Sequence, residues 1–147
     1  MRIRDVMTTK VEQVLPADSI EFAKTLMRVK GVHHLVVVER REVKGIVTAT
    51  QLAEAGAKDS VTVADVMTRH LATASPDLPV RKAANLIRGS VVGALPVLDR
   101  GKLVGIVTVS DLLELIGRGG ARPVEKATRW TLRNRGVLPA QARVGKR

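Results

Sequence analysis

Four consecutive residues offer the clearest chemistry in this sequence: Thr108, Val109, Ser110 and Asp111. They stand where the pattern predicts that a strand ends and a helix begins. The unsatisfied N–H groups and the dipole of a helix N-terminus favour phosphate at such a place. The hydroxyls of Thr108 and Ser110 can donate to phosphate, and Asp111 can accept from vicinal hydroxyls such as those of ribose. The same residues also fit a structural role, with Ser110 as N-cap and Asp111 as a first-turn acid.

A gapless internal repeat surrounds these residues. Residues 5–52 align with residues 65–112 at a constant offset of 60, with 17 identities in 48 pairs. Asp-Val-Met-Thr begins each copy, and Gly-Ile-Val-Thr recurs at 45–48 and 105–108. Two copies of one unit can pack face to face about a pseudo-twofold axis, which would place two related clefts at the seam.

Each copy predicts the element order β-α-β-β-α after a short helical lead at 3–7 or 63–67. An extended segment (11–15 or 71–74) and an amphipathic helix come first, and Asp18 is the expected N-cap of that helix in copy 1. Two short strands joined by a polar turn follow. The last helix is expected to begin at Thr50 in copy 1 and at Ser110 in copy 2. The predicted fold class is α/β, of the α+β kind, with repeats at 1–60 and 61–117.

Composition narrows the classes of function. The chain has no cysteine, and its three histidines lack a metal-ligand spacing. A Gly-x-Ser-x-Gly elbow and a Walker loop are both missing, so neither catalysis nor a metal nor a required cofactor is predicted. The chain begins without an apolar signal region and contains no apolar run near the roughly 20 residues of a membrane span. A soluble cytoplasmic protein without membrane attachment is therefore expected.

The positive charge is concentrated at the end of the chain. Residues 118–147 contain nine Lys/Arg and one acid, which is +8 of the total net charge of +11. A helix is expected from Pro123 to about Asn134, with Trp130 on its apolar side. The basic face could attract the phosphates of nucleic acid, although a solvated tail is the alternative.

The motifs together support a family resemblance. Asp-Val-Met-Thr, a later Leu-Pro-Val and then Gly-Ile-Val-Thr-x-Ser-Asp-Leu, within a tandem repeat, resemble the CBS domain, a pair of which forms a Bateman module. The resemblance covers roughly residues 3–116. It implies binding of an adenosine-containing ligand (AMP, ADP, ATP, S-adenosylmethionine or NAD) between the repeats. It also implies a homodimer that regulates a separate effector protein.

The resemblance implies roles for particular residues of copy 2. Asp111 would hold the ribose hydroxyls, with Thr108 and Ser110 near the ribose and phosphate. Adenine would meet residues on the first strand and residues just before Pro96, namely Leu71, Ala72, Thr73, Ala94 and Leu95.

Copy 1 departs from the motif at two positions. Gln51 replaces the acid, and Gln13 stands where copy 2 has Thr73. An amide can bond a ribose hydroxyl, but without the charge-assisted strength of a carboxylate. One good site around copy 2 and one weak or empty site are therefore expected. His33 and His34 could reach across the seam to a phosphate, or they could be ordinary residues at a strand start.

Three functions remain open from the sequence. The first is a nucleotide-sensing regulatory module that acts on a separate partner. The second is a nucleic-acid-associated protein that binds through the basic tail, with the CBS pair as a dimerisation scaffold. The third is a dimerisation module with both clefts empty.

Overall fold

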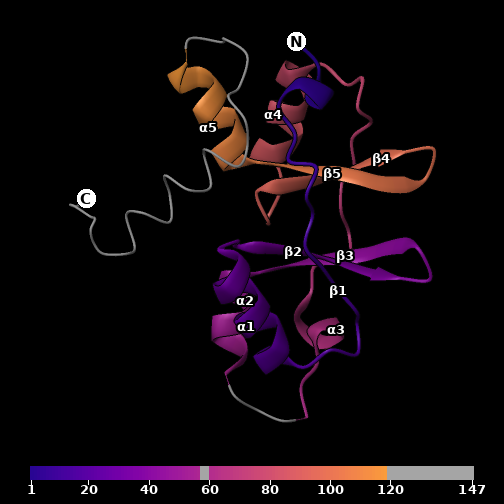
Figure 1. Ribbon diagram of the computed structural model, residues 1–147, viewed down its shortest axis with the longest axis vertical. Coiled ribbons are helices and arrows are strands. Elements are labelled where there is room, and N and C mark those ends of the chain that lie inside the picture. The colour runs from indigo at the N-terminus through magenta and orange to yellow at the C-terminus, as the bar shows by residue number, and fades with distance from the viewer. Residues whose placement is uncertain (57–59, 119–147) are drawn as a thin grey trace.

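The fold repeats one arrangement of elements twice, as the internal repeat predicts. The computed structural model describes residues 1–56 and 60–118. Repeat 1 contains η1 (Ile3–Asp5), β1 (Gln13–Val14), α1 (Ile20–Lys30), β2 (His34–Glu39), β3 (Glu42–Thr48) and α2 (Ala49–Ala55). Repeat 2 contains α3 (Val63–Val66), α4 (Val80–Arg88), β4 (Ala94–Asp99), β5 (Lys102–Thr108) and α5 (Val109–Gly117). The result is a mixed α+β fold whose two halves lie one above the other (Figure 1).

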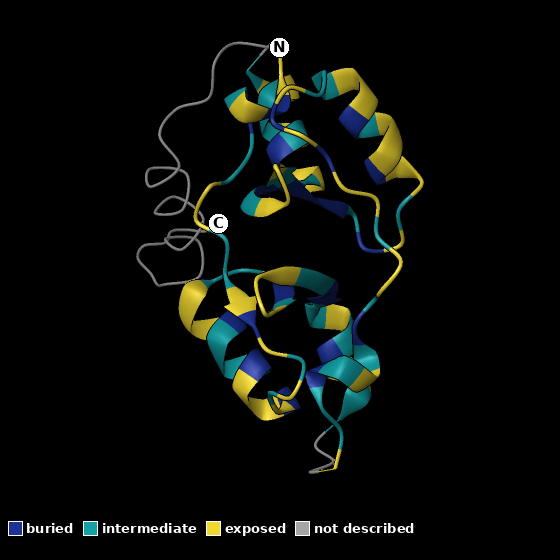
Figure 2. Ribbon diagram, turned by 90° about the vertical axis from the view of Figure 1, so that its right-hand side faces the viewer, coloured by how far each residue is buried: buried dark blue, intermediate teal, exposed yellow. Residues whose placement is uncertain are grey.

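The two sheets face each other across the seam, with helices on their outer sides (Figure 1). Sheet order is β1-β2-β3 in repeat 1 and β4-β5 in repeat 2. An apolar layer packs between the sheets, formed mainly by Val36, Ile46, Val92, Ala94 and Ile106. Each repeat also has its own apolar core between sheet and helices, and Figure 2 shows buried residues on the inner faces of the elements. Burial of these apolar layers stabilises the paired arrangement.

The leads of the two repeats are exchanged. Ile3 and Val6, in the lead of repeat 1, are buried in the core of repeat 2. Val63 and Met67, in the lead of repeat 2, are buried in the core of repeat 1. Neither repeat therefore has a complete core without the other's lead.

Backbone bridges fix this exchange at matching positions. Thr8 pairs with Ile106, and Thr68 pairs with Ile46. Each bridge is closed by two backbone hydrogen bonds of 2.8–3.0 Å. Gly45 and Gly105 stand directly before these isoleucines, because the lead of the other repeat lies against the strand at these two positions. A Cβ at Gly45 would lie 2.6 Å from the Thr68 carbonyl oxygen.

The first strand of repeat 2 is shorter than the sequence pattern predicts. In repeat 1 the Val36 N–H donates to the Glu12 carbonyl beside β1. Pro96 occupies the matching position in repeat 2 and has no N–H to donate. The predicted extended segment at 71–74 is therefore reduced to a single parallel bridge from Ala74 to Val97.

Three helix starts differ from the prediction. Ser19, not Asp18, caps α1 by accepting from the Phe22 N–H. The last helix of each repeat is capped by Thr48 or Thr108, two residues before the expected Thr50 and Ser110. The difference arises because the residue three positions after each threonine completes a reciprocal capping box.

The basic tail predicted at 118–147 lies outside the described residues, apart from Arg118. Within the part of the chain that the structure describes, no helix is long and apolar enough to cross a membrane.

Candidate functional site

The junction between β5 and α5 positions the predicted chemistry. Thr108 caps α5, and its hydroxyl accepts from the Asp111 N–H at 3.3 Å. Asp111 also bonds back to Thr108: its Oδ2 accepts from the Thr108 N–H at 2.9 Å and from the Thr108 hydroxyl at 3.2 Å. This capping box is why the strand ends at Thr108 and the helix begins at Val109. It leaves Ser110 exposed in the first turn of the helix.

Asp111 also connects the two repeats. Its side chain is buried, with the residue 3% exposed, and its Oδ1 accepts from the Thr8 hydroxyl at 3.2 Å. Thr8 belongs to the lead of repeat 1, so this contact crosses the seam. A buried carboxylate needs such donors, because desolvation without hydrogen bonds would be costly.

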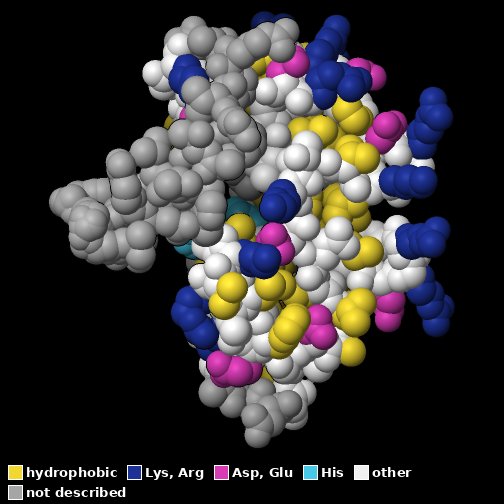
Figure 3. Space-filling model, viewed as in Figure 1, with side chains coloured by type: hydrophobic (Ala, Val, Ile, Leu, Met, Phe, Trp, Pro, Cys, Tyr) yellow, Lys and Arg dark blue, Asp and Glu magenta, His cyan; other side chains and the backbone are white. Residues whose placement is uncertain are grey.

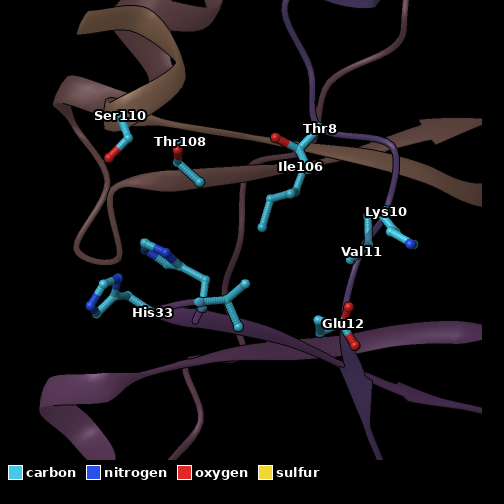
Figure 4. Close-up of a pocket in the computed structure, with 10 residues that line it drawn as sticks. Thr8, Lys10, Val11, Glu12, His33, Ile106, Thr108 and Ser110 are labelled. Atoms are coloured by element: carbon cyan, nitrogen blue, oxygen red, sulfur yellow. The ribbon is translucent and has the colours of Figure 1, made fainter. Parts of the chain in front are cut away.

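A pocket opens beside this junction. Its walls come from the β5–α5 junction, from the lead of repeat 1 and from the turn before β2 (Figure 4). The lining residues are Thr8, Lys10, Val11, Glu12, Val32, His33, His34, Ile106, Thr108 and Ser110. The pocket therefore draws on both repeats, and hydroxyl groups gather on its β5–α5 side.

His34 lines this pocket and also reaches across the seam. Its Nε2 lies 2.8 Å from the Val92 carbonyl oxygen of repeat 2, so Nε2 carries the donated proton. Burial lowers the pKa of His34 below the ordinary 6.5, although the bond to Val92 and the charge of Asp111 act in the opposite direction. The sequence left open whether His34 reaches across the seam to a phosphate or is an ordinary strand-start residue. In the structure His34 reaches across the seam to a backbone carbonyl. His33 is exposed on the pocket wall.

The predicted adenine-contacting residues are not among the residues that line this pocket. Leu71 and Thr73 line a second pocket, together with Glu42, Val43, Arg69, Leu98 and Gly101. Ala72 is exposed between them, and Ala94 and Leu95 are buried in strand β4. None of these five residues lines the pocket that holds Thr108 and Ser110. Their assignment to one ligand site with the β5–α5 junction therefore stays a prediction.

The exchanged leads determine which segment of the chain lies beside the β5–α5 junction. Because Thr8 pairs with Ile106, the β5–α5 junction faces the first segment of repeat 1 and not that of its own repeat. The sequence interpretation therefore missed Thr8, Lys10, Val11 and Glu12 as pocket residues. The identity of Thr8 and Thr68 within the repeated Asp-Val-Met-Thr motif marked the lead as special. It could not indicate which repeat the lead would join.

The matching junction of repeat 1 is internally bonded through Gln51. The Thr48 N–H donates to its Oε1 at 2.8 Å, and its Nε2 donates to the Thr68 hydroxyl at 2.7 Å. This pattern mirrors Asp111 and Thr8 with an uncharged amide in place of the carboxylate. Both ends of the amide are therefore engaged in the described structure.

Metal binding has no support among the described residues. No cluster of three or more His, Cys, Asp or Glu side chains in residues 1–56 and 60–118 could hold an ion.

The fold and pocket define a class: two interlocked α+β repeats that share a pocket at their seam. The sequence profile of the CBS domain matches residues 3–58 and 63–118. The chain therefore belongs to the CBS-domain family, as a tandem CBS pair.

Relatives and structural neighbours agree with this assignment. Over 114 residues the chain is 34% identical to the CBS domain-containing protein YhcV of Bacillus subtilis. This match covers 75% of this chain and 81% of YhcV. It is 37% identical over 117 residues to a homoserine O-acetyltransferase of Methanococcoides burtonii. This match covers 78% of this chain but only 24% of that enzyme. The CBS domain pair of protein MJ0100, solved with 5′-methylthioadenosine and S-adenosyl-L-methionine, superposes with a TM-score of 0.75 at 28% identity. That match covers 81% of this chain and 98% of the other.

Proposed function

We propose that this CBS pair is a regulatory module that binds an adenosine-containing ligand in the seam pocket. One observation carries the proposal: the hydroxyls at the β5–α5 junction and the lead of the other repeat line the same pocket. The bound S-adenosyl-L-methionine and 5′-methylthioadenosine of the MJ0100 pair support an adenosine ligand.

The proposed ligand uses the polarity of the pocket. First-turn N–H groups of α5 and the hydroxyls of Thr108 and Ser110 would bind phosphate or ribose oxygen. Asp111 lies behind this wall, and its Oδ1 is bonded to the Thr8 hydroxyl at 3.2 Å. A ribose hydroxyl would take over that acceptor position, and the released Thr8 hydroxyl would turn toward the ligand. Charge-assisted bonds of this kind are stronger than neutral ones.

The pocket mouth offers donors for an anionic group on the ligand. Lys10 and His33 are exposed on its walls and can donate hydrogen bonds to a phosphate, beside the half-buried Glu12. AMP, ADP and ATP are therefore the first candidates, and S-adenosylmethionine and NAD follow. Binding would join the two repeats more tightly, and a separate partner in the cytoplasm would read the change.

The proposed sensor is a homodimer. Large apolar side chains are exposed on the outer helices, including Phe22 and Val29 on α1 and Val109, Leu113 and Ile116 on α5. Exposed apolar groups at helical spacing commonly mark an interface. The predicted tail interaction with nucleic acid concerns residues outside the described chain and stays a prediction.

The test is calorimetric titration with AMP, ADP, ATP, S-adenosylmethionine and NAD. We expect one site per chain for at least one of them. Asp111→Ala should weaken that binding at least about tenfold, since it removes a charged hydrogen-bond partner. Gln51→Ala is the matched control, because Gln51 occupies the position in repeat 1 that Asp111 occupies in repeat 2. This variant should bind the ligand within about twofold of the wild-type affinity.

Thermal unfolding of both variants checks that each is folded at the titration temperature. Absence of binding to all five ligands would contradict the proposed function. Equal affinity of wild type and Asp111→Ala would contradict the role of Asp111. Two sites per chain, with the second lost in Gln51→Ala, would contradict the single-site proposal.

A further inference from the structure

The two hairpin turns of this fold place arginine in a conformation that arginine rarely adopts. Each hairpin has a two-residue loop, Arg40-Arg41 between β2 and β3 and Arg100-Gly101 between β4 and β5. All four residues have positive φ: 53° and 67° in the first loop, 54° and 82° in the second. Such loops prefer Asn-Gly or Asp-Gly, because a Cβ is strained at positive φ. Three of the four positions nevertheless carry arginine.

The two loops lie on the same edge of the molecule. Figure 1 shows both hairpins ending at the side away from α1 and α5. One pocket touches both of them, since it is lined by Glu42 and Val43 of the first hairpin and by Leu98 and Gly101 of the second. The two turns are therefore neighbours in space although they are 60 residues apart in sequence.

Positive charge dominates this edge, which we call the hairpin edge. Its basic residues are Arg40, Arg41, Lys44, Arg69, Arg100 and Lys102, and its acidic residues are Glu39, Glu42 and Asp99. Lys44 Nζ is 2.9 Å from Glu42 Oε1, so one acid is already neutralised. The three turn arginines are exposed and form no ion pair among the described residues. Figure 3 shows Lys and Arg side chains gathered along this edge.

We propose that the hairpin edge binds the phosphate backbone of a nucleic-acid duplex. Guanidinium groups bind phosphate through paired N–H donors, and exposed arginines on adjacent turns can contact successive phosphates. The residues of this edge include no aromatic side chain on which an unpaired base could stack. Duplex backbone is therefore favoured over single strands. This surface is separate from the seam pocket, so the inference does not depend on the proposed ligand.

The strained turns allow a variant that removes charge without harming the fold. Arg40→Asn, Arg41→Gly and Arg100→Asn together turn both loops into Asn-Gly, the preferred sequence at this geometry. The melting temperature of this triple variant should therefore be equal to or higher than that of wild type. The matched control is Arg28→Gln, Arg81→Gln and Arg88→Gln, which removes three exposed arginines from α1 and α4. Both variants keep the same net charge and the same C-terminal residues.

Binding is measured with the full chain by fluorescence anisotropy, using labelled 30-base-pair DNA and RNA duplexes and the corresponding single strands. We expect the turn variant to bind duplex about tenfold or more weakly than the control variant. The slope of log K against log salt should fall by about 2.7 relative to the control, because each of the three lost phosphate contacts removes roughly 0.9. An equal loss of affinity for the DNA duplex and the RNA duplex in the turn variant would assign the contact to the phosphate backbone that both share and would support the proposal.

Equal binding by the turn and control variants would overturn the proposal, since net charge alone would then explain the attraction. A turn variant that loses single-strand affinity but keeps duplex affinity would also overturn it. Displacement of duplex by polyglutamate at equal charge concentration would overturn it in favour of an acidic protein partner.

Discussion

At the scale of single residues, Asp111 combines a structural and a proposed binding role. Its carboxylate completes the capping box of α5 and accepts from Thr8 of the other repeat. The sequence offered a first-turn acid and a ribose ligand as alternatives. The geometry makes the first of these a fact and leaves the second as a proposal, because one carboxylate has enough lone pairs for both.

His34 makes folding stability depend on pH. Burial lowers its pKa in the folded chain, whereas the unfolded chain titrates near 6.5. Above pH 6.5 both states are neutral and no difference arises. Below it the unfolded chain binds a proton that the folded chain resists, so stability falls as pH decreases, by at most about 1.4 kcal/mol per pH unit.

His34→Ala should therefore flatten the loss of stability between pH 7 and pH 5, as measured by urea unfolding at each pH. Alanine is the residue that repeat 2 carries at the matching position, Ala94. The control is His70→Ala, which should keep the wild-type slope because it removes an exposed histidine that is not among the groups that shift the pKa of His34. If His34→Ala lost stability as steeply as wild type, the effect would have to come from other groups.

At the scale of elements, the exchanged leads explain two repeated glycines. A Cβ at Gly45 would lie 2.6 Å from the Thr68 carbonyl oxygen, and one at Gly105 would lie 2.7 Å from Met7 Sδ and 3.0 Å from the Thr8 carbonyl oxygen. Backbone cannot move away easily, whereas a methionine side chain can. The first glycine is therefore the less replaceable of the two.

Gly45→Ala should destabilise the fold by about 2–3 kcal/mol and Gly105→Ala by about 1–2 kcal/mol, because each overpacks a lead against a strand. Gly117→Ala is the control, since nothing lies within 4 Å of its added Cβ. Its free energy of unfolding should change by less than about 1 kcal/mol, or rise, because alanine favours helix. Equal effects at all three positions, measured by urea unfolding, would contradict the close approach of the leads.

At the scale of the whole molecule, the seam unites the repeats into one unit. The lead of each repeat is buried in the core of the other, and the segment from Thr8 to Gln13 then returns along the pocket to pair beside β2. A ligand in that pocket would contact both repeats at once. Such an arrangement suits a sensor, because differential binding can shift the geometry of the pair.

The proposed homodimer predicts a defined effect of one surface substitution. Leu113 is 62% exposed on α5, where a second copy could bury it. Leu113→Asp should convert a dimer to a monomer in sedimentation velocity at micromolar concentration, because a buried unpaired charge is costly. The control is Val91→Asp, which is 93% exposed outside the helices and should leave the mass unchanged. A wild-type protein that sediments as a monomer would contradict the dimer itself.

The sequence alone determined the repeat, the order of its elements, the CBS resemblance and the chemistry of the β5–α5 junction. These follow from local patterns, since periodicity, turn residues and motif spacing act over a few residues. Helix starts were missed by one or two residues because capping boxes compete at adjacent hydroxyls. Only the tertiary structure decided that Asp111 bonds to Thr8 and that Thr108 and Ser110 share a pocket with residues 10–12, while Leu71 and Thr73 line another pocket. The repeats are so alike that each lead could complete either core, and only packing across the seam selects the exchanged arrangement.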